Sequence, residues 1–488
     1  MKIFYKTMLC LFLGLALSGC QKWLSVTPND QFAAEDLFVR KEGFFKALNG
    51  IYTGMTSSKS YGQELSAGAI DVLARTYHIS SSLHDYHTIS TYQYTDAENR
   101  TIFEGIWKKN FELIANCNVL LDRIPQAPSA VLPEPYYSIV KGEALALRAF
   151  LHFDILRLFG PLWEQDAMDS PSLPYVSVSG NQVQPLISGE DYRQAVIEDL
   201  GASVTLLSDD PIRSQGVRHS DSPSGDSFLY YRQYRMNYFA VKALLCRAHL
   251  WAGEKSKTFE LVEEFLKETQ QTNQAIFPFT SGSAAVHTTL PDRLFSTEVI
   301  FSLFVNSRSD VYNALFSSSL AREKRLSFDM TGTSFDRVAA LYDDQNDYRR
   351  RIWQIRTDNN LPALVNAKYE PIADAPGAHM IPLIRMSEML LMAAETSASL
   401  EQGVAYLNQV RRNRNCIDLK PDSQDALFRA IVDEFRKETI AEGQLFFFYK
   451  RNRLESIPRA DRLTGSAAML LPNYVVPLPE SETSIRIN

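Results

Sequence analysis

The chain has 488 residues, of which 45% are hydrophobic and 22% are charged. This composition is that of a globular protein with a sizeable core, and it excludes a disordered, collagen-like or disulfide-dense chain. Its 57 Asp and Glu residues outnumber its 50 Lys and Arg residues, which gives a formal net charge of −7. An acidic chain without a basic run argues against nucleic acid as a partner, because phosphate contacts need clustered Lys and Arg.

The N-terminus has the pattern of an export signal. Lys2 and Lys6 are followed by an apolar run over residues 8–17, which is too short to span a hydrocarbon core that needs ~20 residues. Ser18, Gly19 and Cys20 come next, in an order that resembles the lipobox of bacterial lipoproteins. We therefore expect a signal peptide over residues 1–19, a lipid anchor on Cys20 and a tether over residues 20–34. The alternative is a plain secreted protein with an incidental cysteine.

The remaining cysteines and the known catalytic motifs give no sign of a cofactor or of catalysis. Cys117, Cys246 and Cys416 are widely spaced and odd in number, so they predict no disulfide framework. The sequence contains no C-x-x-C, G-x-S-x-G, H-E-x-x-H, P-loop or G-x-G-x-x-G motif. We therefore expect no cofactor, no resident metal and no enzymatic activity.

Apolar residues recur at helical spacing through most of the chain. The spacing predicts helices over residues 36–53, 99–124, 135–159 and 190–207. A Ser-, Gly- and Asp-rich loop follows over residues 212–228. Beyond it we expect three helix pairs, over residues 231–251 and 256–268, 386–400 and 403–414, and 427–441 and 444–451. Residues 272–334 predict irregular structure with short strands.

These helix pairs predict a fold class that is mostly all-α. The turn at Gly253, after Trp251 and Ala252, resembles a tetratricopeptide helix–turn–helix. Such units are amphipathic and bury their apolar faces only against neighbouring units, so several must stack. We expect a tetratricopeptide-like helix-pair scaffold with long irregular loops and a few short strands.

Four segments, taken in chain order, carry a resemblance to a known family. They are the Cys20 motif, Trp107 with residues 116–121, residues 142–161, and the C-terminal stretch over residues 384–451. The third segment, from Gly142 to Pro161, is the most specific. Together they resemble the SusD-like (SusD/RagB) family of outer-membrane nutrient-binding lipoproteins. On this resemblance, residues 35–271 form an N-terminal SusD-like helical region and residues 272–488 form the C-terminal SusD/RagB region.

The resemblance implies a location and a set of partners. The chain would sit at the cell outer membrane, held by lipid through acylated Cys20. It would capture an oligosaccharide, or in some members a peptide, and pass it to a SusC-like TonB-dependent outer-membrane barrel. Most charged motif residues are expected to be structural, and residues 436–438 with Glu442 are expected to form a buried or half-buried ion network that joins helices.

Residues 61–98 are the most informative loop for ligand binding, because they contain five tyrosines and three of the chain's 8 histidines. A tyrosine ring can stack on the apolar face of a sugar while neighbouring polar groups bind its hydroxyls. Family analogy adds a second patch near residues 277–320, and a loop tryptophan follows Pro161. The expected ligand-binding residues are Tyr77, His78, Asp85, Tyr86, Tyr92, Trp163 and Tyr312.

Alternative readings of these residues stay open. The tyrosines of the loop could instead cover the helices or contact the barrel, and Trp163 could pack against a helix end. Three alternative functions also remain: a peptide-binding member of the family, an exported glycoside hydrolase, and a purely structural lid. A hydrolase would need two carboxylates ~5–9.5 Å apart in a cleft.

Overall fold

The computed structural model describes residues 37–164, 168–218, 227–270, 275–328 and 335–486. The predicted signal peptide, the tether and Cys20 lie outside these residues. Within the described ranges, no helix combines the length and the apolar character that a membrane crossing requires.

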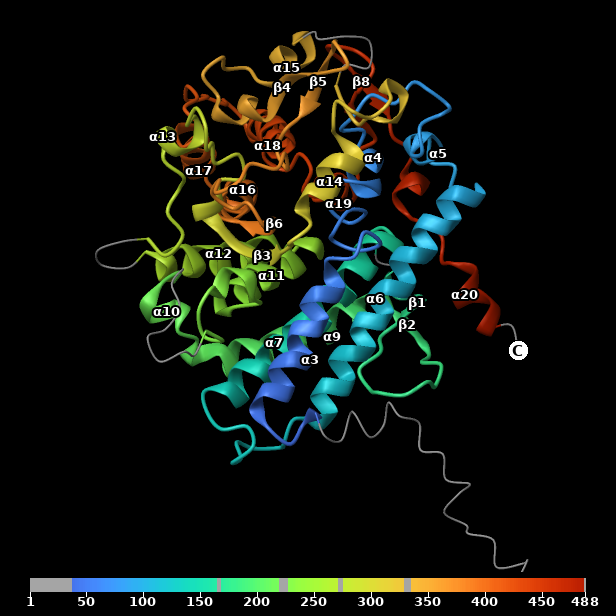
Figure 1. Ribbon diagram of the computed structural model, residues 1–488, viewed down its shortest axis with the longest axis vertical. Helices are drawn as coiled ribbons and strands as arrows, with labels where there is room; N and C mark the ends of the chain where they lie inside the picture. The colour runs from blue at the N-terminus through green and yellow to red at the C-terminus, as the bar shows by residue number, and fades with distance from the viewer. Residues whose placement is uncertain (1–36, 165–167, 219–226, 271–274, 329–334, 487–488) are drawn as a thin grey trace, which may run out of the picture.

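Four long helices build the N-terminal part of the fold. They are α3 (Lys41–Met55), α6 (Ala97–Arg123), α7 (Tyr136–Phe159) and α9 (Gly189–Leu206). Helix α7 is buried along most of its length and packs between α6 and α9 (Figure 1). The side chains of Asp96 and Ser188 accept backbone N–H groups and so begin α6 and α9. All four helices were predicted, with α3 beginning a few residues later than expected.

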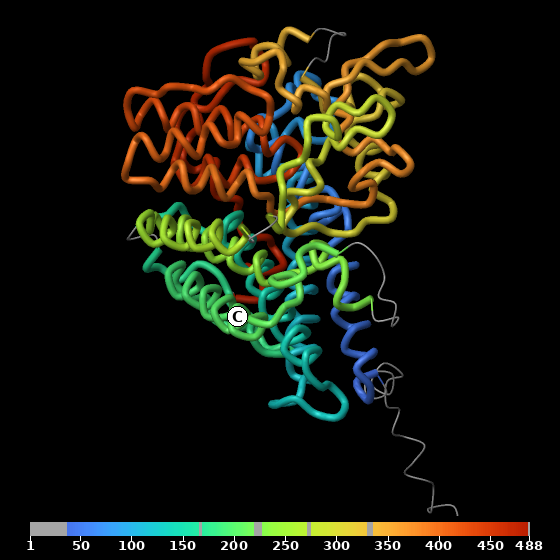
Figure 2. Tube along the Cα trace, turned by 90° about the vertical axis from the view of Figure 1, so that its left-hand side faces the viewer, coloured from blue at the N-terminus to red at the C-terminus, as the bar shows by residue number. Residues whose placement is uncertain are grey.

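The three predicted helix pairs are present and stack on one another. They are α11 (Tyr238–Trp251) with α12 (Lys255–Thr269), α16 (Met386–Thr396) with α17 (Leu400–Arg412), and α18 (Gln424–Glu438) with α19 (Leu445–Arg451). Gly253 makes the first turn possible because its φ is +75°. Helix α12 packs on α16, and α16 packs on α18, so the pairs form a column (Figure 2). The predicted helical, tetratricopeptide-like fold is therefore confirmed, whereas the regional boundary at residue 271 stays a prediction.

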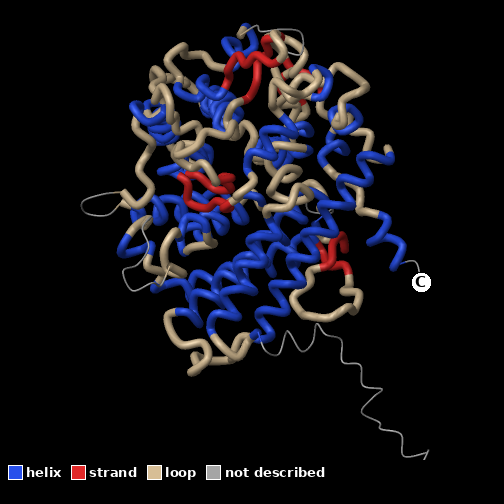
Figure 3. The backbone as a smooth tube through the Cα atoms, viewed as in Figure 1, coloured by secondary structure: helices blue, strands red, loops and turns tan. Residues whose placement is uncertain are grey.

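Each sheet in the described part of the chain has two antiparallel strands (Figure 3). The pairs are β1 (Pro171–Pro174) with β2 (Leu186–Ser188), β3 (Val299–Phe304) with β6 (Met380–Arg385), β4 (Trp353–Asp358) with β5 (Leu361–Asn366), and β7 (Ser456–Pro458) with β8 (Ser466–Ala468). Strand β3 lies in the region expected to hold short strands. The β4–β5 hairpin was not predicted; its turn is made by Asn359 and Asn360, both with positive φ.

Short helices fill the connections between the long ones. Helix α14 (Arg308–Leu315) interrupts a region that was expected to be irregular. The other short α-helices are α4 (Ala69–Leu73), α5 (His87–Ser90), α10 (Ile212–Gln215), α13 (Gly282–Ala285), α15 (Asp336–Leu341) and α20 (Glu480–Thr483). The 3₁₀ helices are η2 (Leu207–Asp209), η3 (Arg232–Tyr234), η4 (Ser296–Glu298), η5 (Arg322–Lys324), η6 (Tyr348–Ile352), η7 (Leu471–Tyr474) and η8 (Ser484–Arg486).

A buried ion network joins the C-terminal helices to β6 and η6. Its centre is Glu438, which accepts hydrogen bonds from Arg349 at 2.9 Å, Arg385 at 2.7 Å and Arg414 at 2.7 Å. Glu442 extends it by pairing with Arg385. The predicted network thus exists around Glu438 and Glu442. Arg436 is not part of it, because its side chain lies on another face of α18 and pairs loosely with Asp433 at 3.6 Å.

A buried carboxylate ties the first short helix to the last helix pair. Asp71 in α4 accepts the backbone N–H of Ala441 at 2.6 Å and of Gly443 at 3.1 Å. Burial of its carboxylate raises the pKa of Asp71 to about 7, although the two N–H donors act in the opposite direction. The charge of Lys368 also lowers the pKa of Asp71, and the charge of Glu442 raises it.

We expect this carboxylate to make stability depend on pH. Because the pKa of Asp71 is raised in the folded state, its stabilising contribution is present at low pH and is lost as the pH rises from about 4 to about 7. Asparagine does not titrate, so the Asp71→Asn variant lacks this loss. The free energy of unfolding of the variant, relative to that of the wild type, should therefore be higher at pH 8 than at pH 5, by on the order of 1–4 kcal/mol.

Urea denaturation at the two pH values measures this difference. The exposed Asp422→Asn variant is the control, and its free energy of unfolding should follow that of the wild type. An Asp71→Asn variant that keeps a constant offset from the wild type across the pH range would contradict the assignment.

Candidate ligand-binding site

The structure buries four of the rings that were predicted to stack on a ligand. Tyr77, Tyr86, Tyr92 and Tyr312 are between 3% and 9% exposed. The Tyr86 hydroxyl donates to Glu64 at 3.0 Å, and the Tyr92 hydroxyl donates to the Leu73 carbonyl at 2.9 Å. Burial raises the pKa of Tyr92 to about 12. These four ring faces are filled by protein, so the structure does not offer them as open stacking surfaces.

The other predicted residues are more accessible, but they do not form one site. His78 is half-buried, and its backbone N–H donates to the Ser327 carbonyl. Asp85 is exposed and pairs with Lys324. The loop over residues 61–98 therefore contacts residues 324–327, just beyond the second predicted patch near residues 277–320, and Tyr77 packs against Phe316 within that patch with ring centroids 5.9 Å apart. Trp163 contacts α9 instead, with the Arg193 guanidinium 5.6 Å from its ring centroid. Ligand contact by His78, Asp85 and Trp163 stays a prediction.

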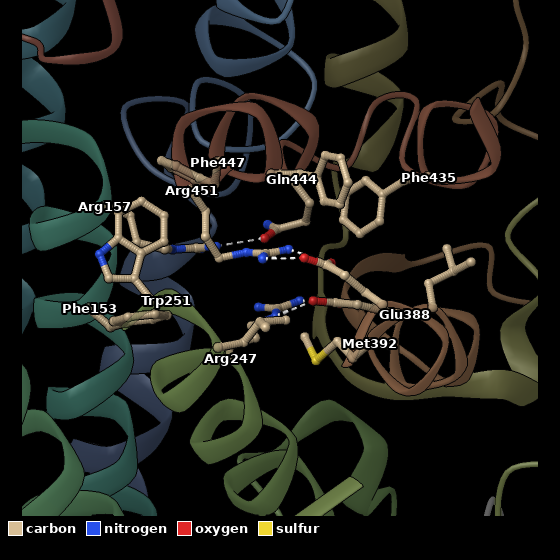
Figure 4. Close-up of a pocket in the computed structure, with 14 residues that line it drawn as sticks. Phe153, Arg157, Arg247, Trp251, Glu388, Met392, Phe435, Gln444, Phe447 and Arg451 are labelled. Carbon is tan, nitrogen blue, oxygen red and sulfur yellow. Dashed lines mark hydrogen bonds and ion pairs between the residues drawn. The ribbon is translucent and has the colours of Figure 1, made fainter. Parts of the chain in front are cut away.

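A small pocket between α7, α11, α16 and α19 is structural (Figure 4). Arg247 and Glu388 point toward each other across it and pair at 2.6 Å, and Arg451 pairs with Glu395 at 2.6 Å. Its volume is about 40 Å³, far below the ~300–1,000 Å³ of ordinary ligand pockets. These charges neutralise one another and join the helix pairs.

A much larger cleft opens between α3, η3 and the end of β3. Its volume is about 710 Å³, which is within the ordinary range for ligand pockets. We call it the aromatic cleft because aromatic rings dominate its wall. Its lining residues are Phe45, Asn49, Tyr52, Thr53, Ser227, Phe228, Tyr230, Tyr231, Tyr234, Arg235 and Phe304.

The rings of the aromatic cleft form two groups. On the α3 side, Phe45 stacks on Phe228 with centroids 3.8 Å apart. On the β3 side, Tyr234 meets Phe304 edge to face at 5.5 Å. Phe304 is 51% exposed although it is fully apolar. Tyr231 is placed by a backbone φ of +51°, which turns the chain into η3.

A buried carboxylate beneath the aromatic cleft fixes its polar groups. Glu143 in α7 accepts the Tyr52 hydroxyl at 2.6 Å and Arg235 Nε at 3.1 Å, and it also pairs with Arg232. Burial, and then the Glu143 charge, raises the pKa of Tyr52 well above its usual value. Arg235 also lies over the Tyr52 and Phe228 rings, and its Nη2 has no hydrogen-bond partner among the described residues. The cleft thus combines flat rings with a fixed cationic donor.

The aromatic cleft was missed from the sequence, although a local signal exists. Five of the eleven residues over 228–238 are aromatic: Phe228, Tyr230, Tyr231, Tyr234 and Tyr238. The sequence interpretation divided this run between a polar loop and the start of a helix. In the structure these residues form a loop that contains the 3₁₀ helix η3 and leads into α11 at Tyr238.

Two further sets of residues were considered as sites: possible metal ligands and the three described cysteines. No group of three or more His, Cys, Asp or Glu side chains there is arranged to hold a metal ion. Cys117, Cys246 and Cys416 are buried and unpaired with one another. Burial raises the pKa of the Cys117 thiol to about 12, which leaves it unreactive.

Solved structures share this fold over nearly their whole length. A SusD superfamily protein from Bacteroides thetaiotaomicron VPI-5482 is 21% identical, with a TM-score of 0.68, and the match covers 91% of this chain and 98% of that one. A SusD-like carbohydrate binding protein from Bacteroides vulgatus ATCC 8482 is 18% identical, with a TM-score of 0.68, over 92% and 97%. Another SusD superfamily protein from that organism is 20% identical, with a TM-score of 0.65, over 92% and 98%.

Two family models match different parts of the sequence. Residues 22–222 match the model described as starch-binding associating with outer membrane, and residues 364–476 match the model of the SusD family. No curated protein matches the chain significantly. The first description names starch binding and association with the outer membrane, and the second names the SusD family alone. With the shared fold, these matches confirm the predicted membership: the chain belongs to the SusD-like family.

Proposed function

We propose that this chain is a cell-surface lipoprotein that binds an oligosaccharide in the aromatic cleft and delivers it to a SusC-like TonB-dependent outer-membrane barrel. The observation that carries the proposal is the cleft itself, where Phe304, Tyr231 and Tyr234 surround a volume of about 710 Å³. Sugars present apolar C–H faces ringed by hydroxyls, and exposed aromatic rings match those faces. Asn49, Thr53 and Arg235 supply hydrogen-bonding groups for the hydroxyls.

The composition of the cleft wall supports binding without cleavage. Glycoside hydrolysis needs two carboxylates ~5–9.5 Å apart beside the bond. No Asp or Glu is among the described residues that line the aromatic cleft. Glu143 lies beneath it and is occupied by Tyr52, Arg232 and Arg235. These groups favour a binding protein over the glycoside hydrolase alternative.

The proposals of a lipid anchor on Cys20 and of a transporter partner are supported by the sequence and the family resemblance, and not by the aromatic cleft. The anchor is proposed from the lipobox-like sequence before Cys20, and an outer-membrane location agrees with the description of the matching family. Delivery to a barrel partner is proposed from the family resemblance. Co-purification of the full chain from membranes with a TonB-dependent barrel would test the transporter, and mass spectrometry of the N-terminal peptide would test the acylation.

Binding in the aromatic cleft is tested with neutral oligosaccharides and one aromatic substitution. We expect isothermal titration calorimetry to find a ligand among malto-, cello-, xylo-, manno- and galacto-oligosaccharides. Phe304→Ala should weaken that binding about tenfold or more, because a central aromatic contact commonly contributes over 1 kcal/mol. The control is Leu361→Ala, since Leu361 is 72% exposed at the β4–β5 turn, away from the cleft.

Two results would count against the proposal. Unchanged affinity in Phe304→Ala would place the ligand elsewhere. Binding of a peptide library, with no binding of any oligosaccharide, would favour the peptide-binding alternative, since tyrosine-rich surfaces also bind peptides.

A further inference from the structure

Five arginines line a second cleft, beside helix α15 and the β7–β8 connection. Arg75, Arg337, Arg436, Arg459 and Arg462 border a volume of about 310 Å³. They come from four places in the fold: the turn after α4, helix α15, helix α18 and the β7–β8 connection. We call this the arginine cleft. Five cations around one cleft are unexpected in a chain whose formal net charge is −7.

Few carboxylates among the described lining residues face these arginines. Asp433 is the only acidic residue among the described residues of its lining, and it lies 3.6 Å from Arg436, beyond good hydrogen-bond distance. Asp461 pairs with Arg459 at 2.5 Å, and hydrogen bonds from Arg459 lower the pKa of Asp461 to about 2. Arg462 is exposed, and no carboxylate of the described chain forms an ion pair with it. The described lining residues therefore carry a net positive charge.

The protein holds parts of this cleft in a defined shape. Arg75 has a φ of +54°, donates to the Ala468 carbonyl at 3.2 Å and lies 5.1 Å from the centroid of the Tyr92 ring. Arg337 donates to the Ala460 carbonyl. Thr76 adds a neutral hydroxyl to the lining, and its oxygen is buried without a hydrogen-bond partner among the described residues. Guanidinium groups fixed by carbonyls and a ring are pre-ordered donors.

We propose that the arginine cleft binds the carboxylate or sulfate group of an acidic sugar. Arginine presents a planar fork of donors that matches the two oxygens of a carboxylate or sulfate. The volume is close to the lower limit for ligand pockets, so it suits one charged sugar unit at a time. Helix α15 and strand β8 lie at the end of the molecule away from the start of α3, as Figure 1 shows. On the proposed function the lipid anchor at Cys20 precedes α3 in the chain, so this position favours an extracellular glycan over a lipid headgroup. That the anionic ligand is a sugar rests on the proposed function; the anion site itself does not.

The experiment compares acidic and neutral probes on the full chain. Calorimetry with tetragalacturonate and with a chondroitin sulfate tetrasaccharide should show binding that weakens as salt is raised from 50 to 300 mM. Arg436→Gln combined with Arg462→Gln should reduce the affinity for the better probe at least tenfold. The matched control is Arg412→Gln with Lys420→Gln, which removes the same charge from exposed positions outside the cleft and should change the affinity less than twofold.

Further measurements distinguish anion binding in the arginine cleft from binding in the aromatic cleft and from binding to a lipid headgroup. Phe304→Ala should leave the binding of the acidic probes unchanged, so a failure of the aromatic cleft is distinguishable from a failure of the arginine cleft. No binding of either acidic probe would overturn the proposal, and so would an equal loss in the control pair. Stronger binding to phosphatidylglycerol vesicles than to both sugars, lost in the Arg436 and Arg462 double variant, would also overturn it in favour of a lipid headgroup.

Discussion

Replacing Glu438 by glutamine is expected to lower the free energy of unfolding by about 3–5 kcal/mol. Glu438 is 3% exposed and accepts hydrogen bonds from Arg349, Arg385 and Arg414. These three cations hold the pKa of Glu438 well below its usual value, against the effect of burial. A neutral glutamine amide would leave the positive charges of these three arginines only partly compensated. Burying uncompensated charge lowers the stability of the folded state.

Urea denaturation at pH 7 measures this loss. The control is Asp418→Asn, because Asp418 pairs with Arg412 on the surface, where both side chains are at least 35% exposed. Exposed ion pairs contribute little to stability, so this variant should unfold close to the wild type. Equal midpoints for Glu438→Gln and the wild type would show that the network adds nothing to stability.

Replacing Arg232 by methionine is expected to cost a similar amount of stability and also to disturb the aromatic cleft. Arg232 is 1% exposed and binds Asp210 through Nε at 2.9 Å and Nη2 at 2.7 Å, while Nη1 pairs with Glu143. Its loss leaves two buried carboxylates undercompensated, which typically costs about 3–5 kcal/mol. Arg232 also follows Tyr231 and begins η3, so the cleft rings should lose their fixed positions.

Two measurements separate these effects. Denaturation should show the loss of stability, and calorimetry at a temperature where the variant is still folded should show weaker binding of the oligosaccharide found for the wild type. Arg232→Lys is the matched variant; it keeps the cation but not the fork, and should recover part of both. A folded Arg232→Met variant with wild-type affinity would show that η3 is held by other contacts.

The helical scaffold could be predicted because its signals are local. Apolar spacing of three and four residues runs through α6 and α7, and Gly160 with Pro161 ends α7. Helix geometry would also have excluded Arg436 from the predicted network. Glu434 and Glu438 are four residues apart and share a face of α18, whereas Arg436, two residues from each, lies on another face. Spacing therefore separates the arginine from the buried network.

The orientation of the tyrosines could not be predicted in the same way. A tyrosine suits a half-exposed sugar site and a core position with a buried acceptor equally well. Tyr61 shows the second case, since its hydroxyl donates to Asp154 at 2.8 Å from a fully buried ring. That acceptor is 93 positions away, so local composition carries no sign of it. The aromatic cleft likewise needs α3, η3 and β3 to meet, which depends on tertiary packing.

The contact of Asp71 with Ala441 and Gly443 has a consequence for when the chain can complete its fold. The partners are 370 and 372 positions apart, so a chain that is still being synthesised contains the carboxylate long before its two backbone donors. Until those residues are made, α4 lacks the groups that satisfy its buried carboxylate, and the N-terminal helices lack part of the surface on which they pack. Final compaction should therefore wait for the last tenth of the polypeptide, and chains truncated before residue 441 should remain sensitive to proteolysis.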